Sequence, residues 1–341
     1  MKEALVDVAV LLVFFTRYHQ FERVFEQVKK ARPSQLLLYQ DGPREGNKDD
    51  IEKIKKCRAI AENVDWNCKI YKYYQKKNIG CDPSGYIAHT WAFSNVDKCI
   101  VLEDDVVSSV SFFSFCKEML DRYENDERVM LITGINLDGI TKEITSDYFF
   151  SSTTFTLGCW ASWGRVVKQW DPKYTFLNDK YVFDKLQDII KERKYVKNFM
   201  SICYYHRSSG IEHFETILIS NQYLNSGLTI IPKKNMINNI GVTDEGTHFS
   251  GTISQLPRGY RRVFTVKRYE IDILNINHPM YVMDDREYQK RAYRIYGWRH
   301  PLIKVYRLIE VLFYKLIQGD FKGAFRDIRI KFDKFIKRTS S

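Results

Sequence analysis

Three adjacent acidic residues, Glu103, Asp104 and Asp105, directly follow the apolar run from Cys99 to Leu102. Carboxylates held this close raise one another's pKa, and partial burial adds to the cost. A bound divalent cation would relieve this repulsion. An extended segment points alternate side chains to opposite sides, so Asp105 can meet a metal while a neighbour binds a hydroxyl. Oxygen ligands without a nearby His or Cys cluster favour Mn²⁺ or Mg²⁺ over zinc.

The same triplet also fits a second interpretation, a solvated acidic turn that caps the next helix. That helix is expected to begin near Ser111 and Phe112.

The sequence around the triplet alternates between strand and helix patterns. Near-continuous apolar runs indicate strands, and apolar residues at helical spacing indicate helices. Asp82 and Pro83 are expected to open a helix, with Asp82 as its N-cap. The other expected elements are strands at 5–15, 35–39, 68–74 and 98–102, and helices at 21–28 and 51–64. This order predicts an α/β fold with a mostly parallel central sheet and helices on both faces.

Ligands of such sheets bind beyond the carboxyl ends of the strands. The residues that follow the first two expected strands are Thr16 and Arg17, and Gln40, Asp41 and Gly42. Together with the acidic triplet, they are the candidate site residues that this part of the sequence indicates.

The composition is that of a folded protein. The chain has 341 residues, of which 44% are hydrophobic and 28% charged, enough to bury a core in one large domain or two ordinary ones. Its seven cysteines are scattered and form no C-x-x-C pair, which is typical of a reduced, cytoplasmic protein. The apolar run Val8–Phe15 is too short to cross a bilayer, which takes about 20 residues. Glu3 and Asp7 also disfavour a secretory signal peptide.

The positive charge is concentrated at the C-terminal end. Residues 286–341 hold 15 Lys and Arg against 5 Asp and Glu, so they carry +10 of the net charge of +11. Apolar and basic residues alternate there at helical spacing, which predicts amphipathic helices that lie on an anionic membrane surface. The alternative is a helical appendage that packs on the main domain. Nucleic-acid binding is disfavoured because residues 1–285 carry almost no net charge. We therefore expect a main domain at 1–285 and a basic helical tail at 286–341.

From about Val8 to His248, the chain resembles the GT-A nucleotide-sugar glycosyltransferases, most closely the N-acetylglucosaminyltransferase I type and its bacterial relatives. The resemblance rests on the order of short motifs. These are Arg17, Asp41 in Gln-Asp-Gly, His89-Thr90-Trp91-Ala92-Phe93, the acidic triplet, Phe112-Phe113, and the Gly158, Trp160 and Trp163 segment.

The resemblance assigns roles to these positions. It implies that Arg17 and Asp41 hold the nucleobase, with Thr16 and His89 on the donor side. Glu103 and Asp104 would contact the ribose and Asp105 the metal, while Gly158, Trp160 and Trp163 would face the acceptor. Simpler alternatives stay open: Arg17 as a surface charge, Asp41 as a turn residue, His89 as a helix histidine, and the two tryptophans as core filling.

The family's catalytic base is a carboxylate in an aromatic-acid pair, often Trp-Asp. The matching pair here is Phe214-Glu215, which departs from that pattern, and Glu212 is a possible substitute. Either could instead be an acid that stabilises a helix start. The glycine-flanked stretch Asn239–His248 resembles the family's closing loop, from which His248 could reach the diphosphate. Asn78-Ile79-Gly80 resembles a donor-side loop.

The resemblance implies an enzyme that uses Mn²⁺ or Mg²⁺ and transfers a sugar from a nucleotide-diphosphate donor, expected to be UDP-linked. The acceptor would be a hydroxyl of a glycan or lipid-linked glycan, and the transfer would invert the anomeric centre. Such an enzyme would be cytoplasmic or peripheral on the inner face of the membrane. Two other classes stay open. A nucleotidyltransferase acting on sugar phosphates would normally have a Gly-rich phosphate loop near the N-terminus, which is missing here. A noncatalytic, membrane-associated carbohydrate-binding or scaffolding protein would function through the basic tail, and the acidic triplet would be only a site for an ion.

Overall fold

The computed structural model describes the chain except residues 157, 191, 243–252, 254, 255, 257, 296, 298, 299, 318, 322, 324 and 326–341. The chain divides into two compact units. The first comprises Met1–Gly241 and Val266–Ala292, and the second comprises Val242–Thr265 and Tyr293–Ser341. Each unit is described by itself.

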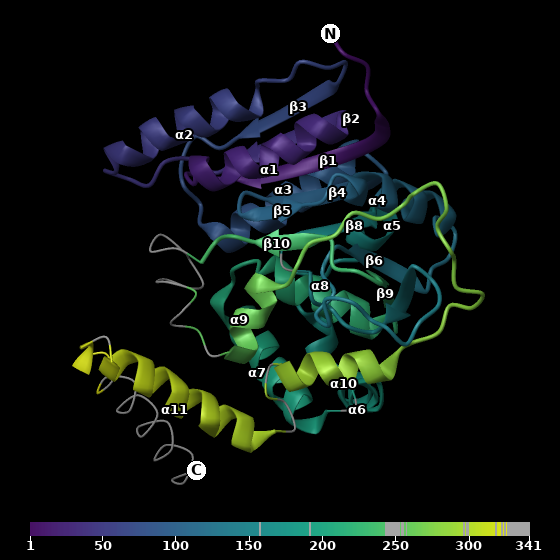
Figure 1. The fold of residues 1–341 in the computed structure, drawn as a ribbon. Coiled ribbons are helices and arrows are strands. Elements are labelled where there is room, and N and C mark those ends of the chain that lie inside the picture. Colours follow the sequence, from purple (N-terminus) through teal and green to yellow (C-terminus); the bar gives the residue numbers. More distant parts are fainter. Residues whose placement is uncertain are drawn as a thin grey trace. The chain divides into compact units, whose positions relative to one another are not determined.

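The first unit is built on an eight-stranded sheet (Figure 1) with the strand order β3-β2-β1-β4-β8-β6-β9-β7. The strands are β1 (Val6–Phe14), β2 (Pro33–Gln40), β3 (Lys69–Tyr74), β4 (Lys98–Glu103), β6 (Val129–Thr133), β7 (Tyr148–Ser151), β8 (Cys159–Trp163) and β9 (Leu228–Pro232). Strands β3, β2, β1 and β4 are parallel to one another. Strand β8 runs antiparallel to both β4 and β6, so β6 and its parallel partner β9 point the same way as β1. The sheet is therefore mostly parallel, as the alternation of elements predicts.

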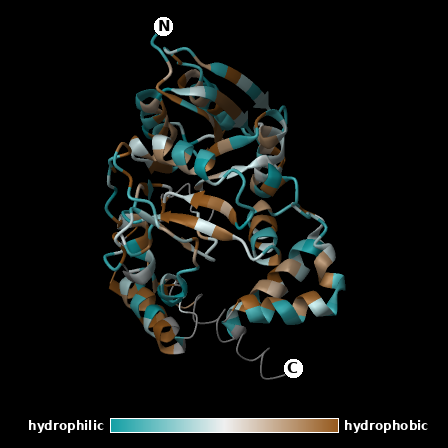
Figure 2. Ribbon diagram, turned by 90° about the vertical axis from the view of Figure 1, so that its right-hand side faces the viewer, coloured by the Kyte–Doolittle hydropathy of each residue, from teal (hydrophilic) through white to brown (hydrophobic). Residues whose placement is uncertain are grey.

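Strand β1 shows why these segments form a covered sheet. Its sequence is almost wholly apolar, and most of its residues are buried, as expected for a parallel strand packed on both faces. Ala9 and Leu11 lie in one core cluster, whereas Phe14 stacks on Phe21 of the first helix at 4.5 Å between ring centroids. In Figure 2, hydrophobic residues (brown) run along the central strands and also occur on the helices.

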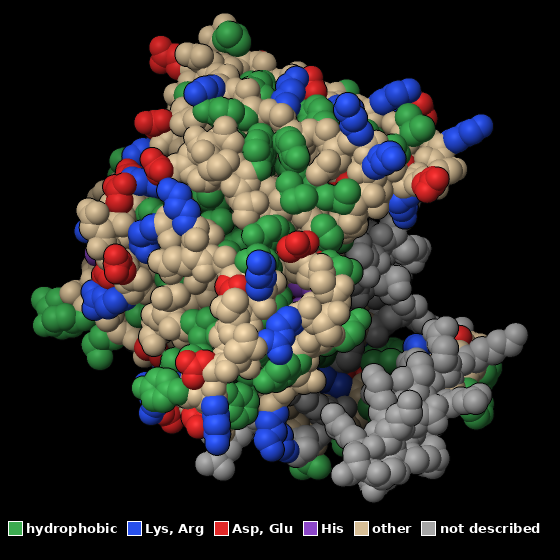
Figure 3. Space-filling model, turned by 180° about the vertical axis from the view of Figure 1, so that it is seen from behind, with side chains coloured by type: hydrophobic (Ala, Val, Ile, Leu, Met, Phe, Trp, Pro, Cys, Tyr) green, Lys and Arg blue, Asp and Glu red, His purple; other side chains and the backbone are tan. Residues whose placement is uncertain are grey.

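Helices cover the two faces of this sheet. Helices α1 (Tyr18–Ala31), α2 (Lys48–Ala61) and α4 (Ser111–Arg122) form one layer, in which α1 contacts both of the others. The core cluster that contains Leu11 also holds apolar residues of α3 (Cys81–Asn95), α6 (Lys180–Ile189), α7 (Arg193–Ser209) and α8 (Phe214–Leu224). The short helix α5 (Gly164–Val167) contacts α3. Lys and Arg side chains are interspersed with Asp and Glu on the face seen in Figure 3.

The start of α3 differs from the sequence-based expectation. The helix begins at Cys81 with Gly80 at its N-cap, so the prediction of Asp82 as the N-cap is wrong, and Asp82 lies in the first turn. Gly80 has a φ of 93°, a left-handed conformation that glycine adopts without a steric penalty. Its backbone N–H donates to the Asp41 carboxylate at 3.2 Å, and this contact fixes where the loop turns into the helix.

The last boundary between the units along the chain lies after Ala292, beyond the expected position at residue 285. Helix α10 (Arg286–Ile295) begins within the first unit, because three of its side chains bind that unit. The Tyr288 hydroxyl accepts from the Leu137 N–H at 3.0 Å, the Gln289 amide donates to Ser152 at 2.8 Å, and Arg291 pairs with Asp138 at 2.9 Å. The expected tail therefore starts as part of the main body.

The second unit contains α9 (Arg258–Thr265) and α11 (Pro301–Ile317). Residues 242–265, which the sequence assigned to the main domain, belong to this unit. Among the described residues, no helix has both the length and the apolar character needed to span a membrane.

Candidate functional site

The carboxyl ends of three adjacent parallel strands bring the candidate residues together. Strand register pairs Phe14 with Gln40 and Val13 with Glu103, so the loops after β1, β2 and β4 leave the sheet side by side. Arg17 comes from the first of these loops, Asp41 from the second, and Asp104 and Asp105 from the third.

Arg17 binds the acidic triplet. Its Nη1 lies 2.5 Å from Asp105 Oδ2 and 3.6 Å from Asp104 Oδ1. The Phe15 N–H also donates to Asp104 Oδ2 at 3.0 Å. Both aspartates are 8% exposed, so the triplet is not a solvated turn, and Arg17 is not a plain surface charge.

The triplet carries more negative charge than its surroundings readily accommodate. Burial and then the charge of Asp105 raise the pKa of Asp104 to about 7, although Arg17 and the Phe15 N–H oppose the shift. The pKa of Glu103 is raised well above its usual value by burial, and then by the charges of Asp105, Glu215 and Asp104. Added positive charge at this place would therefore stabilise the ionised site.

Gly158 lies directly against Glu103. The Glu103 N–H donates to the Gly158 carbonyl at 3.0 Å, which continues the pairing of β4 with β8. Gly158 has a φ of 72°, and a Cβ at this position would lie 2.6 Å from the Glu103 carboxyl group. The structure thus brings this expected acceptor-side residue next to the triplet.

Glu215 reaches the same place from another element. It is exposed in the first turn of α8, and its charge contributes to the raised pKa of Glu103. Its helix is held against α3 because the Phe214 ring occupies the space where Gly85 lacks a side chain. Glu212 precedes the helix, and its charge acts on Tyr86, whose pKa is raised mainly by burial.

A short two-stranded ribbon adds contacts that the sequence did not reveal. Strand β5 (Val106–Ser108) pairs antiparallel with β10 (Ile237–Asn239). The Asn239 amide donates to Asp105 Oδ1 at 3.2 Å, and the Ile240 N–H donates to the Asp105 carbonyl at 2.8 Å. A Cβ at Gly241 would collide with the Asp105 carboxylate. The sequence marked Asn239 and Gly241 only as the start of a loop, and no local pattern links them to Asp105.

Asp41 organises the loop before α3. Its carboxylate accepts hydrogen bonds from the Asn78 amide at 2.8 Å and from the backbone N–H groups of Gly42, Ile79 and Gly80 at 2.8–3.3 Å. Burial raises the pKa of Asp41, and the backbone N–H groups of Ile79, Gly42 and Gly80 oppose the shift. A side chain at Gly42 would collide with the Lys77 backbone. The resemblance of Asn78-Ile79-Gly80 to a donor-side loop thus corresponds to a segment bound to Asp41.

The neighbouring Gln40 is one of the candidate residues that the sequence placed at the end of the second expected strand. It is fully buried, and its amide donates to the Phe15 carbonyl at 2.8 Å while its oxygen accepts from Arg58 Nε at 2.7 Å. Gln40 therefore braces the segment that carries Thr16 and Arg17. Thr16 itself is partly buried in the bend between β1 and α1, where its carbonyl accepts from the Tyr18 N–H at 3.0 Å.

His89 lies in the aromatic core instead of at the strand ends. It is 1% exposed, and its ring centroid lies 4.6 Å from that of Phe214, 5.1 Å from Trp160 and 5.8 Å from Trp170. Burial lowers its pKa to about 3, so the imidazole is neutral at pH 7. In this position His89 cannot contact a nucleotide-sugar donor bound at the strand ends, which is the role that the resemblance implied.

The two expected acceptor-side tryptophans are also buried. Trp160 is 1% and Trp163 is 2% exposed, and the Trp163 indole donates to the Leu120 carbonyl at 2.9 Å. Neither ring has a face open to a sugar, so core filling, the alternative reading, describes their positions. His248, the remaining donor-side candidate, lies outside the described residues.

The side chains at this site are of the kind that binds a hard dication, and Asp105 is the expected ligand. Its carboxylate oxygens are hard donors, and the raised pKa values of its neighbours show negative charge that a cation would offset. Within the described part of the chain, no cluster of three or more His, Cys, Asp or Glu side chains has the arrangement of a metal site.

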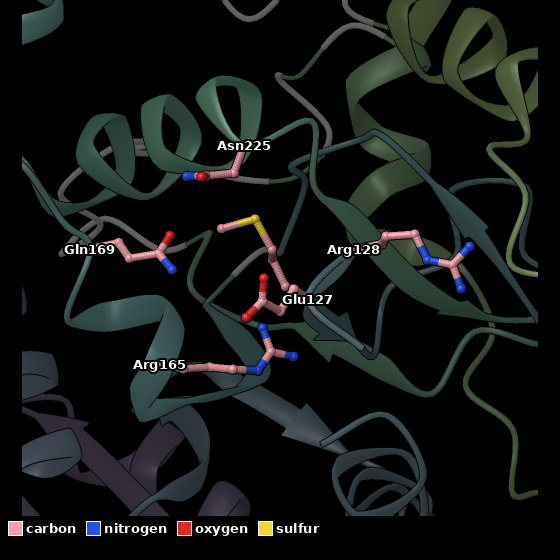
Figure 4. Close-up of a pocket in the computed structure, with 6 residues that line it drawn as sticks. Glu127, Arg128, Arg165, Gln169 and Asn225 are labelled. Carbon is pink, nitrogen blue, oxygen red and sulfur yellow. The ribbon is translucent and has the colours of Figure 1, made fainter. Parts of the chain in front are cut away.

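A separate pocket of about 220 Å³ lies at the amino ends of β6 and β9, away from the candidate residues. Figure 4 shows the side chains that line it. The Arg165 side chain that lines it donates to the carbonyls of Glu124, Asp126 and Val129 at 2.8–3.1 Å. Arg165 therefore has a structural role, because it holds the segment between α4 and β6 in place. The candidate residues Arg17, Asp41, Asp104 and Asp105 lie instead at the carboxyl ends of the strands.

The sequence was compared with models of known protein families and with curated proteins, and neither comparison found a match.

Proposed function

We propose that the chain is a GT-A-type glycosyltransferase, which moves a sugar from a nucleotide-diphosphate donor, expected to be UDP-linked, to a hydroxyl of a glycan or lipid-linked glycan. One observation carries the proposal: the contact of Arg17 with Asp104 and Asp105 where β1 and β4 end. The positively charged Arg17 and several carboxylates lie at the carboxyl ends of parallel strands. Such a combination suits a ligand that has both phosphates and hydroxyl groups.

In this proposal the donor's nucleoside lies along the ends of β1, β2 and β4. Arg17 binds the nucleobase, and Asp41 holds the loop Asn78-Ile79-Gly80 that borders it. Glu103 and Asp104 accept hydrogen bonds from the ribose, while Asp105 would hold Mn²⁺ or Mg²⁺. When bound, such an ion supplies positive charge for the diphosphate leaving group.

Glu215 is the proposed general base. Its side chain is exposed in the first turn of α8, on an element different from the one that holds the triplet. It takes the proton of the acceptor hydroxyl as that oxygen bonds to the anomeric carbon and the bond to the diphosphate breaks. Attack from the face opposite the leaving group inverts the anomeric centre. Glu212 is the second candidate for this role.

Calorimetry with UDP tests the donor site most directly. The wild-type protein should bind UDP in the presence of Mn²⁺, and Arg17→Ala should lose most of that binding while keeping a cooperative thermal transition. Arg128→Ala is a matched control, because this arginine pairs with Asp126 at the surface, with its side chain 61% exposed. Folded wild-type protein that takes up neither UDP nor Mn²⁺ would rule out the proposal.

A further inference from the structure

Helix α11 carries a continuous apolar stripe that is exposed in the described residues. At about 100° per residue, the stripe positions fall within an arc of roughly 120°, and the four charged positions of the helix lie outside it. The stripe residues are 47–81% exposed: Leu302, Val305, Tyr306, Ile309, Phe313, Leu316 and Ile317. Exposed apolar surface of this extent marks an interaction site.

The other side of α11 packs within its own unit. The Arg307 guanidinium lies 4.9 Å from the centroid of the Tyr260 ring, and Arg261 lies 5.4 Å from that of Tyr314. Gly259 allows close contact, because a side chain there would collide with Arg307. Helix α9 thus contacts the face of α11 that bears Arg307 and Tyr314, and this face does not include the stripe positions.

The charge of this region identifies the kind of partner. Residues 286–341 carry a net charge of +10 in the sequence, so an anionic partner is attracted and a second copy of the same region is repelled. Nucleic acid is anionic too, but its phosphates offer no surface for a stripe of Leu, Ile and Phe. An anionic lipid surface offers both negative charge and apolar surface. Its headgroups can bind the basic residues, and its acyl chains can receive the apolar stripe.

We propose that α11 binds in the plane of an anionic membrane surface, with its apolar stripe at the boundary between headgroups and acyl chains. A helix of 17 residues is about 25 Å long, and no described helix is suited to span a bilayer. This inference does not rest on the proposed transfer reaction, since it requires no bound nucleotide or metal.

Co-sedimentation of the full chain with vesicles tests it. The wild-type protein should bind vesicles of phosphatidylcholine mixed with phosphatidylglycerol, and bind much less to phosphatidylcholine alone. The double variant Ile309→Ser/Phe313→Ser should bind at least about tenfold more weakly, because it removes two inserting side chains. Ile309 and Phe313 are 59% and 60% exposed, so their replacement leaves buried packing intact.

Two further variants separate insertion from general effects. Tyr181→Ser/Tyr205→Ser removes two side chains that are each 68% exposed on α6 and α7, and it should bind vesicles like the wild type. Phe313→Leu keeps the stripe apolar and should also retain binding. Equal vesicle binding by the wild type and the stripe variant would overturn the proposal. It would also fail if the wild type ignored anionic vesicles, or if it formed a dimer that the stripe variant disrupts without any vesicle binding.

Discussion

Arg17 Nη1 lies 2.5 Å from Asp105 Oδ2, which joins the end of β1 to the end of β4 across 88 positions of the sequence. The contact is mostly shielded from solvent, since the two side chains are 16% and 11% exposed. It ties the proposed nucleobase contact to the proposed metal ligand. A donor that brings phosphates and a cation would have to compete for both groups.

Replacing Asp105 with Ala should reduce metal-dependent transfer by more than about 1,000-fold, because the expected ligand for the charge on the leaving group is lost. Release of the nucleoside diphosphate from a nucleotide sugar, followed as Mn²⁺ is titrated, measures the effect. Asp65→Ala is a suitable control, because this aspartate pairs with Lys2 at the surface. Retained turnover with an unchanged response to Mn²⁺ would contradict the role of Asp105.

Glu215→Gln should leave donor binding intact and reduce transfer by about 100- to 10,000-fold, since the amide cannot accept the acceptor's proton. Calorimetry with UDP and a transfer assay on the same preparation separate the two effects. Glu212→Gln is the matched comparison, because Glu212 lies three residues away and acts on Tyr86. If only the Glu212 variant lost transfer, the base would be Glu212, and equal loss of binding and transfer at Glu215 would indicate a structural role.

Gly158→Ala and Gly210→Ala should each destabilise the fold by about 1 kcal/mol, because both glycines have left-handed backbones. Only the first should also lose UDP binding. A Cβ at Gly158 would displace the Glu103 carboxyl group, whereas nothing lies within 4 Å of one at Gly210. Denaturant unfolding and calorimetry together check this prediction. Loss of UDP binding in both variants would show that backbone strain, not contact with Glu103, matters for the site.

His89 should make the fold less stable as the pH falls. Its pKa of about 3 in the folded state lies below the unfolded value of 6.5, so below pH 6.5 the unfolded chain binds the extra proton. Protonation of His89 therefore does not affect the free energy of unfolding above pH 6.5. Below that pH it lowers the free energy of unfolding by roughly 1.4 kcal/mol per pH unit, down to about pH 3.

The variant His89→Phe isolates that contribution, because the raised pKa of Asp104 acts in the opposite direction in the wild type. The difference between the unfolding free energies of wild type and variant should therefore change in favour of the variant between pH 7 and pH 5. Urea unfolding at the two pH values measures it. A difference that did not depend on pH would show that His89 is not held neutral in the core.

Much of the first half of the sheet follows from the sequence, because its signals are local. The apolar runs that become β1, β2 and β4 are each followed by a polar turn, and parallel strands place those turns at one edge. That is why Arg17, Asp41 and the triplet could be grouped before their contacts were seen. The turn at Gly80 could not be predicted, since its geometry depends on the carboxylate of Asp41, 39 positions away.

Sequence alone determined the alternation of strands and helices, the residues at the strand ends and the position of the basic segment, because periodicity and charge are properties of neighbouring residues. Only the tertiary structure decided that β8 runs antiparallel between β4 and β6, that Gly241 lies against Asp105, and that His89, Trp160 and Trp163 are enclosed. It also decided that Tyr288 and Arg291 belong to the first unit. An aromatic or charged side chain has the same local pattern whether it faces a ligand or a core, and the difference depends on which distant segment covers it.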